Sequence, residues 1–254
     1  MSDDRSPTRK ADGPPVSAYD RIAELYDPWS RSVTEDIGFY VAEARKAAGA
    51  GPARMPVVEL GVGTGRIAVP TAQAGVPVIG VDSSQAMLEV CRGRAEAEGA
   101  ASLLDLRLGD FRDPPVPERV LLVTCPFRAY LHLDSDAERL SALRRARELL
   151  LPGGRLVFDV FAPSRDDVEE TNGRWLEREP GIWERADWDE AARLLVLRVR
   201  GGETVATMTL AWLSAGEWAA LLERAGFEIE ACYGWFDRRP YEGGEDSIWL
   251  ARRT

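Results

Sequence analysis

The sequence has little of the chemistry that metal centres and disulfide-rich folds require. It contains a single histidine, His132, so a site built from several histidines is excluded. The three cysteines, Cys91, Cys125 and Cys232, are odd in number, and no two of them have the spacing of metal ligands. Nothing in this set indicates a disulfide framework. We therefore expect a protein of a reducing, cytoplasmic compartment with no bound metal.

Long apolar runs and an excess of basic residues are also missing. No segment is apolar over the length that spans a bilayer, so we expect no membrane partner. The chain has 42 acidic and 32 basic residues, which gives a net charge of −10. Because a negative surface repels phosphate backbones, we do not expect a nucleic-acid partner. A small neutral or cationic molecule is the better expectation.

The length of 254 residues is sufficient for one large domain with a sizeable core and a small insertion. Residues 1–16 are polar and rich in proline and charge, which predicts a disordered leader. Residues 17–48 have mostly helical spacing of apolar side chains, broken by Pro28.

Residues 49–162 alternate between apolar strand-like runs and helical segments, which indicates a parallel sheet with right-handed crossovers. Strands are expected at 56–60, 77–81, 102–108, 120–125 and 155–161, and helices at 65–74, 84–97 and 135–150.

From residue 163 to residue 213 the pattern changes to strand-like alternation without helices, with Gly201 and Gly202 as a hairpin turn. Residues 214–254 then add one helix and two strands that we expect to pair as a hairpin. The predicted fold is α/β: a doubly wound, Rossmann-like, seven-stranded sheet with a C-terminal antiparallel hairpin and a small antiparallel insertion after strand five.

The segment VVELGVGTGRIA, residues 57–68, places Gly61, Gly63 and Gly65 directly after a strand that carries Glu59. Glycines at a strand-to-helix turn let a ligand approach the backbone. Dinucleotide sites use G-x-G-x-x-G and hold a pyrophosphate there, which a neighbouring carboxylate repels. A carboxylate suits a cationic amino group or a sulfonium. The loop therefore favours a positively charged nucleoside over NAD, although a tight turn alone is the alternative.

Acidic residues follow the next two predicted strands. Asp82, after the second strand, is placed to accept hydrogen bonds from both ribose hydroxyls, and a helix N-cap is its alternative role. Asp110, after the third strand, is placed to accept from an adenine amino group beside Phe111, and a turn residue is its alternative role. Met87 fits either the other side of the adenine ring or the core. All these residues fall at one edge of a parallel sheet.

Together, VVELGVGTGRIA, VIGVDSSQAML, LRLGDF, LLVTCPFRAYLHL and LLLPGGRLVFDVF closely resemble class I S-adenosylmethionine-dependent methyltransferases. The resemblance covers roughly residue 17 to the C-terminus. It implies that the glycine loop holds the methionine part of S-adenosylmethionine and that S-adenosylhomocysteine is the product. It also implies that Glu59 supports the cationic end of the cofactor, through water or the loop backbone. The residues expected at the cofactor are Tyr26, Arg31, Glu59, Gly61, Gly63, Gly65, Asp82, Ser83, Met87, Asp110, Phe111 and Cys125.

The segment after the fourth strand, CPFRAYLHL at 125–133, lacks the N/D-P-P-Y/F box of adenine, cytosine or glutamine N-methylation. This segment and the Y…Y-D pattern in residues 19–27 resemble small-molecule methyltransferases of the glycine/sarcosine and deoxysugar amine type. The resemblance implies methyl transfer to an amine of a small molecule, with residues 17–48 as a helical lid. Small-molecule O-methylation is the alternative, and an NAD-dependent oxidoreductase or a non-catalytic cofactor-binding protein is less favoured.

We expect Tyr19, Tyr26, Phe127 and His132 to surround the methyl-transfer site. Aromatic faces stabilise a sulfonium, and His132 is placed to remove or relay a proton. The alternatives are a core histidine and tyrosines that only anchor the lid. The tryptophans of the insertion fit a substrate roof, the face of a homodimer or the core of the insertion; they are Trp175, Trp183, Trp188 and Trp212.

Overall fold

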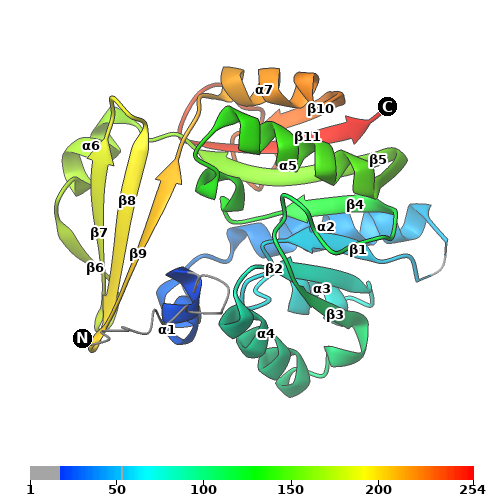
Figure 1. Ribbon diagram of the computed structural model, residues 1–254, viewed down its shortest axis with the longest axis horizontal. Coiled ribbons are helices and arrows are strands. Elements are labelled where there is room, and N and C mark those ends of the chain that lie inside the picture. Colours follow the sequence, from blue (N-terminus) through cyan, green and yellow to red (C-terminus); the bar gives the residue numbers. More distant parts are fainter. Residues whose placement is uncertain (1–17, 53) are drawn as a thin grey trace, which may run out of the picture.

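The computed structural model describes residues 18–52 and 54–254. The leader predicted for residues 1–16 lies outside this part of the chain. Figure 1 shows a twisted sheet flanked by helices, with a second, smaller sheet beside one end of it. No helix in the described part is long and apolar enough to cross a membrane.

The main sheet has seven strands in the order β10-β11-β5-β4-β1-β2-β3. Strands β1 to β5 are mutually parallel, and β11 runs antiparallel between β5 and β10. This order confirms the predicted Rossmann-like sheet and its C-terminal antiparallel hairpin. The strands are β1 (Val57–Leu60), β2 (Val78–Asp82), β3 (Leu104–Leu108), β4 (Val120–Cys125), β5 (Leu150–Phe161), β10 (Phe227–Tyr233) and β11 (Asp246–Arg253).

Helices cover both faces of this sheet. Successive side chains of a strand point to opposite faces, so Val57 packs in the cluster of Phe39 and Val58 in the cluster of Leu143. Because both faces of the sheet are buried, the sequences of its parallel strands are largely continuous apolar runs. The first face carries α2 (Glu35–Ala50), α3 (Ala68–Gln73) and α4 (Gln85–Ala97), and the second carries α5 (Asp136–Leu149) and α7 (Ala215–Arg224).

The N-terminal helical residues form two packing units. The 3₁₀ helix η1 (Ala18–Arg21) and α1 (Ala23–Trp29) lie against α4 and the second sheet (Figure 1). Helix α2 instead packs on the main sheet through its buried side chains Phe39 and Tyr40. Helix α2 thus belongs to the packing of the main sheet, whereas η1 and α1 contact the second sheet.

The second sheet is an antiparallel meander inserted between β5 and α7, as predicted. Its strands are β6 (Trp175–Glu179), β7 (Ile182–Asp189), β8 (Leu194–Gly201) and β9 (Thr204–Ala211). The short helix α6 (Arg165–Thr171), which the sequence analysis missed, precedes it and begins with a capping box formed by Ser164 and Asp167. Buried apolar side chains of the insertion belong to the same core cluster as those of α5 and α7.

Candidate active site

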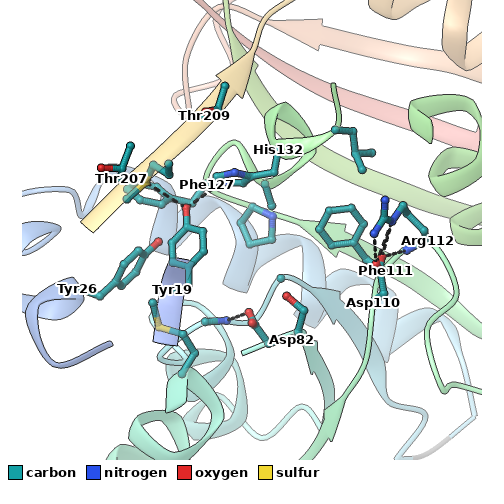
Figure 2. Close-up of a pocket in the computed structure, with 18 residues that line it drawn as sticks. Tyr19, Tyr26, Asp82, Asp110, Phe111, Arg112, Phe127, His132, Thr207 and Thr209 are labelled. Atoms are coloured by element: carbon teal, nitrogen blue, oxygen red, sulfur yellow. Dashed lines mark hydrogen bonds and ion pairs between the residues drawn. The ribbon is translucent and has the colours of Figure 1, made fainter. Parts of the chain in front are cut away.

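Two cavities lie at the carboxyl ends of the parallel strands. The first, of about 360 Å³, is lined by residues that follow β1, β2, β3 and β4, and we call it the sheet-edge cavity. The second, of about 400 Å³, lies between α1, the start of α2 and the inserted sheet, and we call it the insertion cavity. Four side chains line both and form the shared wall: Tyr19, Phe127, His132 and Met208 (Figure 2).

The three glycines of the loop after β1 have different surroundings. Gly61 and Gly63 line the sheet-edge cavity, whereas Gly65 is buried and does not. A Cβ on Gly63 would meet no atom of the described residues within 4 Å, but a Cβ on Gly65 would lie 2.5 Å from Cys91 Sγ in α4. Gly65 does not line the cavity, and its lack of a side chain serves close helix packing. The expected contact of Gly65 with the cofactor stays a prediction. The positive φ of 80° at Gly65 also explains why α3 begins at residue 68 and not at 65.

Asp82, at the end of β2, faces the sheet-edge cavity together with Ser83 and Met87. Its Oδ2 accepts from the N–H of Gly63 at 2.8 Å (Figure 2). Its Oδ1 accepts from the N–H of Ser84 at 2.8 Å. Burial raises the pKa of Asp82, although these N–H groups oppose the shift. Helix α4 is capped by Ser84, which accepts from the N–H of Met87, so the alternative role of Asp82 as N-cap is wrong.

Asp110 and Phe111 also line the sheet-edge cavity, as expected. Burial alone would raise the pKa of Asp110, but hydrogen bonds from Arg112 hold that pKa below its usual value. Arg112 Nε lies 2.9 Å from Asp110 Oδ2, and Arg112 itself borders the cavity. The backbone carbonyl of Asp110 also accepts from the N–H of Asp113, so Asp110 begins a turn as well. A ligand at this end therefore meets an ion pair and not a free carboxylate.

The shared wall is organised around Tyr19 and His132. The Tyr19 hydroxyl lies 2.7 Å from His132 Nε2 and 3.5 Å from Met208 Sδ (Figure 2). Burial lowers the pKa of His132 to about 4, and a hydrogen bond to the backbone of Thr209 partly opposes this. A hydrogen bond that raises the pKa stabilises the protonated ring, so the ring is the donor and the Thr209 carbonyl is the acceptor. A neutral His132 then offers Nε2 as an acceptor for the Tyr19 hydroxyl.

Tyr26 completes the aromatic surroundings of this wall. Its ring lies edge-on to those of Tyr19 and Phe127, with centroids 6.0 and 6.1 Å apart, and it lines the sheet-edge cavity. The four residues expected at the methyl-transfer site thus lie together, although they come from η1, α1, the turn after β4 and the 3₁₀ helix η3 (Ala129–His132).

Glu59 lies behind the glycine loop and lines neither cavity in the described part of the chain. Its side chain is only 3% exposed, and burial raises its pKa to about 8 against the opposing effect of Arg66. The backbone N–H of Ala68 forms a hydrogen bond with it. Glu59 therefore supports the loop from the protein side. Its predicted support of the cationic end of the cofactor, through water or the loop backbone, stays a prediction.

Two other residues expected at the cofactor, Cys125 and Arg31, line neither cavity in the described part of the chain. Cys125 has no exposed surface and belongs to the core, because the last residue of β4 points into the sheet packing. Arg31 is exposed and lines neither cavity within the described residues. The buried arginine of this region is Arg66, whose guanidinium forms hydrogen bonds to both carboxylate oxygens of Asp36.

The inserted sheet contributes more to the site than its sequence pattern indicated. Strand β9 brings Thr207 and Thr209 to the sheet-edge cavity on either side of Met208 (Figure 2). Of the four insertion tryptophans, only Trp188 lines the insertion cavity in the described part. The other aromatic residues there are Tyr19, Trp29, Phe127, Phe161, Trp235 and Phe236.

Comparison with known proteins decides what this arrangement is. Residues 57–154 match the methyltransferase domain family. An uncharacterized methyltransferase of Geobacillus kaustophilus is 33% identical over 164 residues, which cover 63% of this chain and 71% of that protein. The structure of the CcbJ methyltransferase from Streptomyces caelestis is similar with a TM-score of 0.79 and 28% identity, covering 94% of this chain and 98% of the other. The chain belongs to the class I S-adenosylmethionine-dependent methyltransferases.

A second relative is similar over most of this methyltransferase. The cypemycin N-terminal methyltransferase of a Streptomyces species is 24% identical over 234 residues, covering 89% of this chain and 90% of its own. The similarity therefore extends past the cofactor-binding strands into the inserted sheet and the C-terminal hairpin.

The sheet-edge cavity of the methyltransferase fits S-adenosylmethionine, the cofactor of the family. The backbone at Gly63 leaves open space where any other residue would place a Cβ. Asp82 presents a carboxylate fixed by two backbone N–H groups, which suits a pair of vicinal hydroxyls. Met87 and Phe111 supply apolar surface for a flat base.

Proposed function

We propose that this methyltransferase transfers the methyl group of S-adenosylmethionine to an amine nitrogen of a small molecule held in the insertion cavity. The observation that supports this most directly is the shared wall. Tyr19, Phe127, His132 and Met208 border both the sheet-edge cavity and the insertion cavity. A donor on one side and a nucleophile on the other meet there in the close, aligned arrangement that displacement at carbon requires.

In this proposal the loop at Gly61 and Gly63 takes the methionine part of the cofactor, and Asp82 takes the ribose. Asp110 and Phe111 take the adenine, with Met87 against the ring, and Ser83 and Tyr26 complete the enclosure. S-adenosylmethionine supplies an electrophilic methyl group on a sulfonium. Aromatic rings at the shared wall favour that positive charge and exclude water from it.

The state of His132 favours nitrogen over oxygen as the acceptor. A hydroxyl acceptor needs a base strong enough to take its proton, whereas an amine needs only a free lone pair. Burial holds the pKa of His132 near 4, and its Nε2 is already engaged with the Tyr19 hydroxyl. The imidazole is therefore a weak base in this setting, better suited to orienting the acceptor than to ionising an alcohol.

The charge of the insertion cavity supports the same acceptor. The described residues that line it include seven carboxylates but only two arginines, Arg128 and Arg178. Such a cavity attracts an amine in its protonated form, and aromatic side chains around it bind the cation through their faces. The bound amine gives its proton to water before its free lone pair attacks the methyl group. The name of the cypemycin relative, an N-terminal methyltransferase, is consistent with this chemistry. We also propose η1 and α1 as the lid over the acceptor, tied to the insertion by a 2.9 Å hydrogen bond from Trp29 to Glu184.

The acceptor class is tested by incubating the protein with methyl-labelled S-adenosylmethionine and pairs of small molecules that differ only in carrying an amine or a hydroxyl. We expect the labelled methyl group to be transferred to the amine member of each pair. Transfer to hydroxyl members alone would replace this proposal by O-methylation. Tight binding of S-adenosylhomocysteine without transfer to any member would favour a non-catalytic cofactor-binding protein.

His132→Ala is expected to lower kcat about 100-fold, because the Tyr19 hydroxyl loses the partner that fixes it at the shared wall. The dissociation constant of S-adenosylhomocysteine, measured by calorimetry, should stay within about threefold, since His132 lies at the far side of the cavity from Asp82 (Figure 2). His132→Gln, which can still accept a hydrogen bond, should recover part of the rate. An unchanged kcat in His132→Ala would remove this residue from the mechanism.

A further inference from the structure

The turn between β4 and η3 has an unusual backbone. Phe127 has a φ of 57° and Arg128 a φ of 64°, so two consecutive residues with side chains adopt the left-handed conformation. This conformation is unfavourable for residues other than glycine and persists only where surrounding contacts impose it. Phe127 is also a member of the shared wall. The strain thus lies directly at the proposed methyl-transfer site.

One buried carboxylate holds both residues of this turn. Asp159, near the end of β5, is 5% exposed. Its Oδ1 accepts from the N–H of Phe127 at 2.8 Å, and its Oδ2 accepts from the N–H of Arg128 at 3.1 Å. Successive backbone N–H groups in such a turn form a concave site for an anion, and here the anion is a side chain of the protein itself. Hydrogen bonds to an ionised carboxylate are stronger than hydrogen bonds between neutral groups.

The same carboxylate is anchored from the other side by α2. The Tyr40 hydroxyl, from a side chain that is 1% exposed, donates to Asp159 Oδ1 at 2.5 Å. Three donors therefore converge on two oxygens. This leaves little capacity for Asp159 to bind the acceptor directly, although it borders the insertion cavity.

We propose that Asp159 is a positioning residue for methyl transfer, which acts by holding the turn at Phe127 and Arg128 so that the Phe127 ring forms the shared wall. This inference rests on the proposed function of that wall. The ring is fixed further by the Arg66 guanidinium, 4.5 Å from its centre, and by the edge of Tyr26. Loss of the carboxylate would let the turn relax and would move a ring of the wall at which donor and acceptor meet.

The clamp works only while Asp159 is ionised, because a protonated carboxyl would point an O–H group among groups that are themselves donors. Burial raises the pKa of Asp159 to about 6, although the hydrogen bond from Tyr40 opposes the shift. The turn should therefore loosen as the pH falls through about 6. The titratable or charged groups that face Asp159 come from α2, β4, the glycine loop and the turn itself; they are Asp36, Tyr40, Cys125, Arg66 and Arg128.

The first test is a pH titration of the backbone amide signals of Phe127 and Arg128 by NMR of the full chain. We expect both signals to shift with a midpoint near pH 6 in the wild type and to lose this titration in Asp159→Asn. Tyr40→Phe should move the midpoint to higher pH, because it removes a donor that favours the ionised form. Amide signals that do not follow this titration in the wild type would overturn the clamp. This readout needs no acceptor, so it separates failure of the clamp from failure of the proposed function.

The second test is kinetic and uses the amine that accepts label in the panel above. Asp159→Asn should lower kcat about 100-fold with the KM of the amine within threefold, and it should abolish the loss of rate below pH 6. Asp187→Asn, an aspartate of β7 that pairs with Arg185 and Arg198 away from both cavities, should change neither kcat nor the amide titration. An Asp159→Asn effect confined to the KM of the amine would make Asp159 a binding residue and overturn the proposal.

Discussion

Gly63→Ala is expected to weaken S-adenosylmethionine binding by roughly 30-fold, equivalent to about 2 kcal/mol, because the added methyl group enters the cavity that the cofactor fills. The folded protein itself has room for it: no atom of the described residues lies within 4 Å of the new Cβ. The free energy of unfolding should fall by only about 1 kcal/mol, the penalty of the positive φ of 53° at this position.

Gly65→Ala is the matched control, two residues along the same loop. Its Cβ would lie 2.5 Å from Cys91 Sγ and 3.0 Å from Val69 Cγ2, at a φ of 80°. The expected loss of unfolding free energy is about 3 kcal/mol, from strain together with overpacking. Because Gly65 does not line the cavity, the folded fraction of this variant should bind the cofactor nearly as the wild type does.

The two glycine variants are compared by urea unfolding and by calorimetric titration with S-adenosylmethionine. The expected pattern is a crossover, with affinity lost at position 63 and stability lost at position 65. If Gly63→Ala bound the cofactor normally, the cofactor would not lie against this loop in the way proposed here.

Glu59→Gln is expected to remove a large pH dependence of stability. The pKa of Glu59 is raised from 4.5 to about 8 in the folded protein. Between these two pH values the Glu59 carboxyl keeps a proton in the folded protein that it has released in the unfolded chain. The contribution of Glu59 to the free energy of unfolding is therefore fully present below pH 4.5 and declines as the pH rises. By pH 8 the wild type should have lost about 4 kcal/mol through this one group. Glutamine is always neutral, so the variant should avoid this loss.

Urea unfolding of both proteins at pH 5, 6, 7 and 8 gives the measurement. The difference in unfolding free energy between Glu59→Gln and the wild type should grow in favour of the variant with each step, which isolates Glu59 from other titrating groups. If the free energies of unfolding of the two proteins changed with pH in parallel, Glu59 would have an ordinary pKa. Water or Arg66 would then stabilise its charged form behind the loop.

Local sequence patterns were sufficient to predict the sheet and one side of the site. Alternating strands and helices leave few topologies, and parallel strands bring their carboxyl ends to one edge. Asp82, Asp110 and Phe111 each follow a strand directly, so the connectivity alone placed them at the sheet-edge cavity. The glycine loop was also visible, since Gly61 and Gly63 directly follow a strand that carries Glu59.

Other assignments depended on packing between segments far apart in the chain. Gly63 and Gly65 look alike in sequence, and only the approach of α4 makes one a cavity residue and the other a packing residue. The sequence analysis named Arg31 and did not single out Arg66, because the burial of Arg66 depends on α2 bringing Asp36 to its guanidinium.

Short-range spacing and chain connectivity are enough to predict a charged nucleoside cofactor at the edge of a parallel sheet. The wall between the cavities could not be predicted in this way, because it is built from contacts between remote segments. Asp159 meets the turn at Phe127 from 32 positions away, and Met208 meets Tyr19 from 189. An acid within the apolar run LVFDVF was the one available signal for Asp159. Its partners were invisible because a hydrogen bond between remote segments leaves no periodic pattern in the chain.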